Sequence, residues 1–565
     1  MALKKVLSNK LLEVVLDQHK TAENFQRPYY QKFAEYYSLY RGVFDSSRQN
    51  YTGRANLFVP YIFSTIETVH PRITASKPKI LVLPREQSDY PKADAVGAML
   101  DYRWQTMDMQ EKLKMVVKQM LIYGVGVLKL YWDFKGERDD VERDEPCADI
   151  VDLYDFFLDP NAHCIEDASY VVHKSIRTLE YIKNAGIYEN LQKLKDEEIQ
   201  QTSEYKTERD STLGLSRPKK KGIELLEYWG KADLGDGEQE AVITVANKTT
   251  VIRAVPNPYN HQKKPFISFH DNPMPLEFWS LGEVEPLRSL QYELNDVRNQ
   301  RMDNVTSILH KMWKVSNNAD VDESELVWRP GGVVHVNDMT GVEPLEVTDV
   351  TGSSYNEETL IKGDIQQTSG ISDYTAGQGN QSKALANDTA TGIALLQEAG
   401  SVRLKTKLEN VENGIKKFGE MLLSLEQQYT DQALVIRVVG DRGNVWREIK
   451  PEELRGKFDL RVESGSTQPM NKQIQRAEAR ELLNTIVPFA QLGVNIGYFI
   501  RHLISTYDLP NPDEAFSQQG QPSLLGAAGT PADTGGIAIP GVANSPIATG
   551  VPNAGLAGGI GGLRP

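Results

Sequence analysis

The feature that most constrains the fold is a long helical stretch over residues 389–429. Asp388 or Thr389 is a suitable N-cap, because a short side-chain oxygen accepts hydrogen bonds from the free N–H groups of a first helical turn. At 1.5 Å per residue such a helix is about 60 Å long. Apolar residues recur along it at alternating steps of four and three, at Leu404, Leu408, Val411, Ile415, Phe418, Leu422 and Leu425. The pattern predicts one long helix with a narrow packing seam.

The chain is large and acidic. Its 565 residues predict three to four domains, at roughly 150 residues per domain. Lys and Arg number 63 against 77 Asp and Glu, and the net charge of −14 argues against a protein that grips nucleic acid along a basic face. Two cysteines, Cys147 and Cys164, are too few for a disulfide framework. Residues 1–20 indicate an amphipathic helix rather than a signal peptide, and no apolar run approaches the ~18 residues of a membrane span. We therefore expect a soluble intracellular protein.

Two segments depart from the average composition. Residues 520–565 contain 12 Gly and 6 Pro, with only Asp533 and Arg564 charged. This tail is expected to be disordered, because it cannot bury enough apolar surface to offset its chain entropy. Residues 315–358 carry −9 of the −14, with Arg329 as the single base. The ten acids of this segment are Asp320, Asp322, Glu323, Glu325, Asp338, Glu343, Glu346, Asp349, Glu357 and Glu358.

Helical and strand periodicities alternate along the chain and predict an α+β fold. Helices are expected at 6–44, 56–73, 89–122, 284–313, 357–371, 389–429 and 471–507. Strands are expected at 125–134, 148–158, 170–177, 222–229, 241–246, 249–255, 433–439, 445–449 and 458–463. The first six strands are expected to form one antiparallel sheet domain, interrupted by a mobile charged excursion at 196–221. Tyr29, Tyr30, Tyr36, Tyr37 and Tyr40 are expected to pack in a core rather than to stack on nucleic acid.

No catalytic constellation is found. The sequence has no phosphate-binding loop of the G-x-x-x-x-G-K-[ST] type, no H-E-x-x-H and no G-x-S-x-G. His163, Cys164, Cys147 and His173 match no standard zinc spacing, so no metal site is expected. Residues 137–145 lack the glycine and final glutamate of a calcium loop and predict a solvated hairpin tip. We therefore predict no catalytic residue, no cofactor and no metal.

Several stretches taken together resemble the portal proteins of tailed double-stranded DNA bacteriophages, most closely those of short-tailed phages. The stretches carrying the resemblance are RANLFVPYIFSTIETVHPRI (54–73), LIYGVGVLKLYWDF (121–134), DLYDFFLDPNA (152–162), SLGEVEPLRSLQYELNDVRNQRMDNV (280–305), RPGGVVHV (329–336), and 369–412. Each is weak alone, but together they follow the order of the family over roughly residues 54–470.

The resemblance implies a portal-like subunit in which two stem helices flank a small α/β clip. The implied parts are a helical and β-rich wing (1–280), stem helix 1 (281–314), the clip (315–354), stem helix 2 (355–373), a tunnel loop (374–388), a long wing helix with a β return (389–470), crown helices (471–510) and a disordered tail (511–565). The seam at 404–425 is then either an intramolecular wing contact, which we favour, or a contact between subunits.

The resemblance also implies a ring of twelve subunits around a DNA channel. Residues expected to face the channel or the neighbouring subunit are Asn295, Arg298, Asn299 and Arg301, together with Asp303 and Asn304. Gln378, Asn380, Gln381 and Lys383 of the tunnel loop are expected to approach the DNA, with Lys383 as the best candidate for a transient phosphate contact. The acidic clip, from Asp320, Asp322, Glu323, Glu325, Asp338, Glu343 and Glu346, is expected to repel phosphate, so that DNA slides.

On this reading the chain is a viral portal subunit of the virion, assembled in the host cytoplasm, and not an enzyme. The implied partners are further copies of the chain, double-stranded DNA, the terminase, the major capsid protein and head-tail adaptor or tail proteins, with no membrane. Two alternatives stay open: another oligomeric virion component, such as a head-tail connector or a scaffold-associated protein, and a nucleic-acid enzyme with an unrecognised motif.

Overall fold

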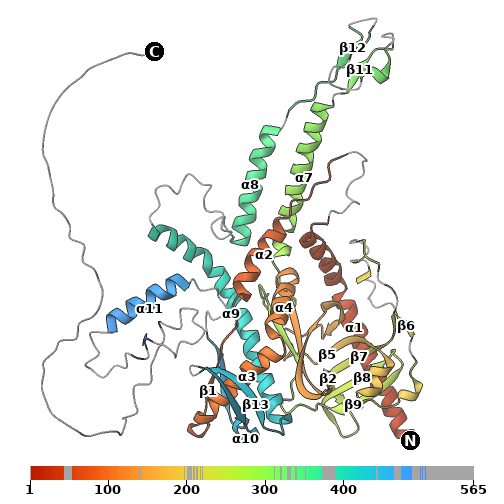
Figure 1. The fold of residues 1–565 in the computed structure, drawn as a ribbon. Coiled ribbons are helices and arrows are strands. Elements are labelled where there is room, and N and C mark those ends of the chain that lie inside the picture. Colours follow the sequence, from red (N-terminus) through yellow and green to blue (C-terminus); the bar gives the residue numbers. More distant parts are fainter. Residues whose placement is uncertain are drawn as a thin grey trace, which may run out of the picture. The chain divides into compact units, whose positions relative to one another are not determined.

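We analysed a computed structural model of residues 1–565 (Figure 1). It describes residues 2–43, 54–138, 141–195, 197–199, 206–207, 210, 214–216, 218, 220–310, 312–317, 321–326, 333–336, 340–349, 351–371, 390–440, 443–463, 472–486, 497, 499–500 and 503. The chain divides into two units, Met1–Pro512 and Asp513–Pro565. All described residues belong to the first unit, and the predicted disordered tail lies outside them.

Four helices build the N-terminal part: α1 (Ala2–Arg41), α2 (Tyr61–Thr74), α3 (Tyr90–Thr106) and α4 (Met109–Tyr123). The prediction of one helix over 89–122 was wrong, because Asp108 adopts a left-handed conformation with φ 51°. Asp tolerates this region better than most residues, and no Gly or Pro marks the break. Tyr30, Tyr36 and Tyr40 of α1 pack in the core as predicted, and Tyr29 packs against it, whereas Tyr37 is only partly buried and is not part of this core.

The predicted antiparallel sheet domain consists, in the described residues, of two antiparallel sheets. One has the order β10–β2–β3, from Phe266–His270, Val125–Arg138 and Val141–Val151. The other has the order β4–β5–β7–β8–β9, from Phe156–Leu158, Tyr170–Arg177, Lys220–Asp233, Glu238–Ala246 and Thr250–Pro256, and β6 (Glu197–Ile199) also pairs with β7. The predicted strand over 148–158 divides because a 3-10 turn, Leu153–Asp155, interrupts it where the Asp152 side chain accepts from Tyr154 N–H.

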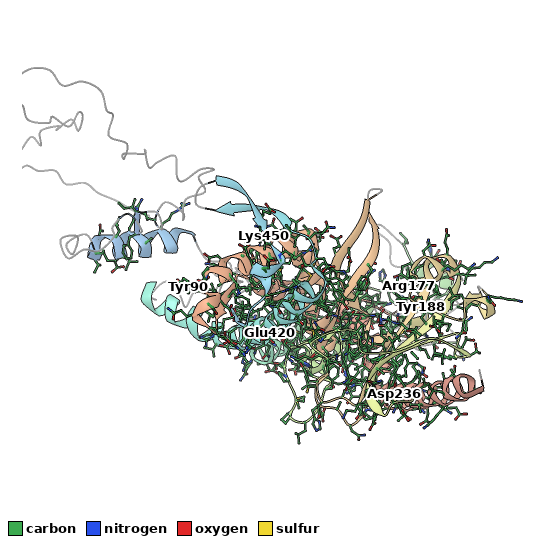
Figure 2. The ribbon with its side chains drawn as sticks, turned by 90° about the horizontal axis from the view of Figure 1, so that it is seen from below. Tyr90, Arg177, Tyr188, Asp236, Glu420 and Lys450 are labelled. Atoms are coloured by element: carbon green, nitrogen blue, oxygen red, sulfur yellow. The ribbon has the colours of Figure 1, made fainter. Side chains whose placement is uncertain are left out.

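Two details of this region bear on the predictions. Strands β2 and β3 pair as far as Arg138 opposite Val141, which places residues 137–138 and 141–145 at the end of a hairpin, as predicted, and residues 139–140 lie outside the described residues. The excursion predicted at 196–221 is described only in part. Within it, Lys206 is buried and contacts the Asp155 carboxylate at 2.5 Å and that of Asp152 at 2.9 Å. At the edge of the six-stranded sheet, Arg177 and Tyr188 lie close together (Figure 2), where helix α5 (Leu179–Asn184) covers a small second core.

Two helices, α7 (Val284–Leu309) and α8 (Thr351–Ser369), pack side by side (Figure 1). Between them the chain forms the short strands β11 (Trp313–Val315) and β12 (Val342–Pro344) and the 3-10 turn η5 (Glu323–Leu326). Helix α7 was predicted to reach residue 313 but ends at Leu309, and Trp313 instead pairs with Pro344 in the ribbon of β11 and β12. Helix α8 begins earlier than predicted, because the Asp349 carboxylate accepts a hydrogen bond from Thr351 N–H at 2.9 Å and caps it.

The long helix α9 (Ala390–Tyr429) has the predicted bounds within one residue. Its seam is intramolecular, as we favoured: Val411, Ile415 and Phe418 are each at most 1% exposed in the main core. Strands β13 (Leu434–Gly440) and β14 (Gly443–Ile449) form a hairpin, and the short helix α10 (Pro451–Leu454) leads to β15 (Phe458–Val462).

Strand β15 pairs antiparallel with β1 (Ile80–Pro84), which sequence reasoning missed. Of the residues predicted to form crown helices, 471–510, the structure describes one helix, α11 (Lys472–Ile486). Mixed helices and antiparallel sheets confirm the α+β class. Among the residues with described structure, no helix has the length and apolarity that a bilayer crossing requires.

Candidate functional site

The candidate site is the hairpin of α7 and α8 together with the clip residues at its far end (Figure 1). Sequence reasoning assigned the polar residues of α7 to a channel or to a neighbouring subunit. Each of these side chains has defined partners inside the chain, described below.

One face of α7 carries amide and carboxylate oxygens at four-residue spacing: Gln291, Asn295, Asn299 and Asp303. Each oxygen accepts a hydrogen bond from a backbone N–H of the first turn of α2 or of the segment before it, namely Ile62 at 3.2 Å, Val59 at 3.0 Å, Leu57 at 2.7 Å and Ala55 at 2.6 Å. The amide groups also donate back, from Asn299 to Leu57 C=O and from Gln291 to Val59 C=O. We call this set the amide ladder.

The ladder works because two periods nearly coincide. Four helical residues rise about 6.0 Å, and two extended residues rise about 6.6 Å. Alternate residues of the segment, Ala55, Leu57 and Val59, therefore meet successive ladder side chains. The helix binds the extended segment much as a neighbouring strand would, and it fixes the chain entering α2 against the stem.

The ladder corrects a prediction. Asn295 is 2% exposed and Asn299 8% exposed, and both are bonded to backbone of the same chain. Sequence reasoning expected both side chains to face a channel or a neighbouring subunit, and that expectation was wrong. Asp303 is likewise bonded to Ala55 N–H, and Asn304 donates to Thr348 C=O near the start of α8. The spacing of four was visible in the sequence, but the extended partner was not.

A buried charge cluster joins α7 to α8. The Glu358 carboxylate lies 2.6 Å from the Arg301 guanidinium, 2.7 Å from the Lys362 ammonium and 3.6 Å from the Arg298 guanidinium. Arg301 also lies over the Tyr355 ring, 4.2 Å from its centroid. Burial alone raises the pKa of Glu358, but hydrogen bonds from Lys362 and Arg301 lower it below its ordinary value. Glu358 is therefore ionised at neutral pH.

This cluster changes two expectations. The Arg301 side chain is 3% exposed and serves the α7–α8 contact, so its assignment to the channel was wrong. The Arg298 side chain is 35% exposed and stays a candidate for a subunit or channel contact. Glu358, which counted toward the acidic segment, is neutralised inside the stem and adds nothing to the exposed charge of the clip.

Among the predicted clip acids, Asp322, Glu343 and Glu346 are exposed. Glu325 is partly covered and accepts hydrogen bonds from His335 N–H at 2.8 Å and from the His335 ring. Glu343 lies opposite Lys314 in the β11–β12 ribbon. Lys314 is a base that comes directly before the acidic segment 315–358. Glu323 lies in η5, and Asp320 and Asp338 fall outside the described residues.

The outward face of the stem is acidic as well, which sequence reasoning did not register. Glu293 and Asp296 on α7, and Glu357 and Asp364 on α8, are exposed. Of the bases on these helices, Arg298, Arg301 and Lys362 pair with Glu358, and Arg288 pairs with Glu35 of α1. Within the described residues, the hairpin therefore exposes unpaired carboxylates, while each of these four bases has a carboxylate partner.

A second buried charge cluster lies where the stem meets the wing. The Lys407 ammonium contacts the carboxylates of Asp271, at 2.5 Å, and Glu283. Burial and the neighbouring Glu283 raise the pKa of Asp271 well above its ordinary value. Burial alone would lower the pKa of Lys407, but Asp271 and Glu283 raise it. Sequence reasoning missed these three residues, because nothing in their spacing along the chain brings them together.

The remaining site predictions concern the tunnel loop and cofactors. Gln378, Asn380, Gln381 and Lys383 fall outside the described residues. Within the described ranges, no three His, Cys, Asp or Glu side chains come together in a way that would hold a metal ion. His163, Cys164, Cys147 and His173 form no such group.

Comparison with protein families decides the identity. The family model described as Phage SU10 portal protein matches residues 133–524, more than half of the chain. The chain belongs to the phage SU10 portal protein family. A second model, Phage P22-like portal protein, matches residues 16–243. The first match contains both stem helices, the clip and α9, and the second contains α2 to α4 and most of both wing sheets.

Membership defines the general role of the chain. Portal proteins are structural, non-enzymatic components of the phage head, so this portal protein is a component of the virion that serves genome packaging. Assembly as a ring of twelve around a DNA channel is typical of the family. Helices α7 and α8, whose exposed carboxylates are described above, lie within the region of the SU10 portal match.

Proposed function

We propose that this portal protein forms the channel at one capsid vertex through which a terminase packages the genome, to which tail proteins attach, and through which the DNA later leaves. The observation that carries the proposal is the hairpin of α7 and α8, which brackets a small acidic clip within the region of the SU10 portal match. Assembly takes place in the host cytoplasm, and the capsid vertex is formed with the major capsid protein.

The electrostatics of the stem suit a conduit. A phosphate gripped by a Lys or Arg releases counterions and adds affinity, so a basic bore would hold its cargo. In this stem three bases pair with Glu358 and Arg288 pairs with Glu35, while Glu293, Asp296, Glu357 and Asp364 are exposed. A ring of such stems repels phosphate, and double-stranded DNA passes without being held.

The tunnel loop at 374–388 supplies the opposite interaction. Lys383 is the only base in that loop, so twelve copies place one ring of positive charges beside the DNA. We assign to Lys383 a transient phosphate contact, with Gln378, Asn380 and Gln381 as neutral hydrogen-bonding neighbours. The exposed clip acids Asp322, Glu343 and Glu346 are assigned to the motor and to the tail adaptor, which meet the clip from outside.

The competing function is that of another oligomeric virion component, such as a head-tail connector. The long paired helices on either side of the clip favour the portal. Electron microscopy of the purified full-length chain in negative stain separates these outcomes. Rings with a central hole and a projecting stem support the proposal, whereas a persistent monomer at micromolar concentration contradicts it.

A further inference from the structure

The loop between β10 and α7, residues 271–283, exposes an apolar tip that the functions above do not use. Residues 272–277 are all exposed, and four of them, Pro273, Met274, Pro275 and Leu276, are consecutive apolar residues. Leu276 is 78% exposed, the highest value among the large apolar side chains of the described residues, and Met274 is 37% exposed. A run of four exposed apolar residues costs solubility unless a partner covers it.

The loop is closed and fixed at its base. Asn272 and Leu281 form two backbone hydrogen bonds with each other, of 3.1 Å each, and these bonds hold the two ends of the loop together. Lys407 of α9 binds Asp271, Asn272 and Glu283. Asn410 Nδ2 donates to Asp271 C=O at 3.0 Å, so α9 holds both ends of the loop.

Close packing on α4 and β2 fixes the base further. Asp271 N–H donates to Gly124 C=O, and Glu283 N–H donates to Leu121 C=O. A Cβ on Gly282 would lie 2.8 Å from Gly124 N and from Leu121 O, so only glycine fits there. The base of the loop is therefore fixed on the neighbouring elements, and it determines where the tip lies.

Aromatic packing anchors the flank of the tip. Phe278 is 3% exposed and Trp279 is 6% exposed, and their rings lie edge to face. Trp279 stacks on Tyr29 of α1, and Tyr29 neighbours Phe25, which is 45% exposed. The flank of the tip is therefore held against α1.

The backbone of the tip is strained where it is most exposed. Leu276 adopts φ 62°, the left-handed region that favours glycine and asparagine. Such strain persists when the surroundings determine it, and it concentrates at functional positions. Two prolines restrict the tip in advance, so little conformational entropy is lost when it docks.

We propose that residues 273–276 form a knob by which each subunit docks onto the next copy of the chain in the portal ring. A ring is closed by heterologous contacts, in which one surface of a subunit meets a different surface of its neighbour. The loop ends at Glu283, directly before the stem helix α7, so the base of the knob moves with the stem that the ring must align. The inference rests on the proposed ring assembly.

The test compares full-length variants by mass photometry over a concentration series. Leu276→Asp is expected to raise the concentration for half-assembly at least tenfold. Ile187→Asp is the matched control, because Ile187 is an exposed loop residue of 44% exposure outside the knob, and it should assemble like the wild type. Equal assembly of Leu276→Asp and wild type overturns the inference. A wild type that forms no rings contradicts the proposed function instead.

A second variant separates docking from folding. Leu276→Asn keeps a residue that accepts the left-handed conformation but removes the apolar contact. Its unassembled subunit should unfold at the wild-type temperature or above, while ring formation is weakened. A benzoylphenylalanine photo-crosslinker at position 276 should join two copies of the chain within rings. Crosslinks only to another virion protein, with normal rings, would overturn the contact between subunits.

Discussion

At the scale of single residues, burial controls ionisation in the wing sheets. Lys129 and Glu227 form an ion pair of 2.7 Å beside His173, and Glu227 also accepts from the Trp229 indole. Burial lowers the pKa of His173 to about 3, with Lys129 adding to the effect. Burial alone would raise the pKa of Glu227, but Lys129 and its other partners lower it to about 2. His173 is therefore neutral and Glu227 charged over the whole physiological range.

The neutral His173 makes the wing sensitive to acid. In the unfolded chain a histidine titrates near pH 6.5, whereas in the folded chain it stays neutral down to about pH 3. Stability is then fully present above pH 6.5 and is lost as the pH falls toward 3, at up to about 1.4 kcal/mol per pH unit for one such group. We expect His173→Leu to make the unfolding free energy less dependent on pH between 6 and 4.5.

Urea unfolding at several pH values measures this slope. The matched control is His163→Leu, since His163 is exposed and the substitution also removes one histidine. If both variants keep the wild-type slope, burial of His173 is not a source of acid sensitivity.

At the scale of elements, the amide ladder determines how the segment before α2 is held. We predict that Asn299→Leu frees the N–H and C=O of Leu57, because both bond to this amide. Leaving two backbone groups without partners costs about 1–3 kcal/mol each where they are buried, and less if water reaches them. Amide hydrogen exchange at residues 55–59 should accelerate at least tenfold. Gln300→Leu, on the exposed side of the same helix, should leave it unchanged.

The contact between the two stem helices depends on Glu358. We predict that Glu358→Gln lowers the unfolding free energy by about 3 kcal/mol, because it leaves the buried Arg301 guanidinium without its anionic partner. Its neighbour Glu357 is exposed on the same helix, so Glu357→Gln is the matched control. Denaturant unfolding followed by circular dichroism measures both. Equal stability of the two variants would show that Arg301 finds another partner.

Elements with strong periodicity were predictable from sequence, and tertiary interactions account for the rest. The seam of α9 gave its bounds within one residue, and its described residues from Leu408 to Leu425 form one buried face. Strand β1 was missed because its partner β15 lies near the other end of the chain. The polar residues of α7 suggested an exposed face, but Asn295 and Asn299 are buried against backbone that no helical pattern reveals.

At the scale of the whole molecule, the ring requires a surface that DNA passes without being trapped. Lys383 is the only base of the 374–388 loop, and we propose that its ring touches phosphate. Lys383→Ala should reduce the amount of DNA packaged or retained per particle, while ring assembly is unchanged. Gln381→Ala is the control within the same loop. DNA content of purified particles, measured beside ring formation, tests this, and normal packaging by Lys383→Ala would remove the loop from the DNA path.

The pairing of β1 with β15 has a consequence for synthesis. Arg85 and Asp459, which bind each other beside this pair, are 374 residues apart. At about 5–20 residues per second, a ribosome needs roughly 20 to 75 seconds to make the intervening chain. During that time β1, with its leucines Leu81 and Leu83, has no strand to pair with. The nascent portal subunit therefore completes this pairing only after β15 has been made, so a chain cut short before residue 458 cannot form it.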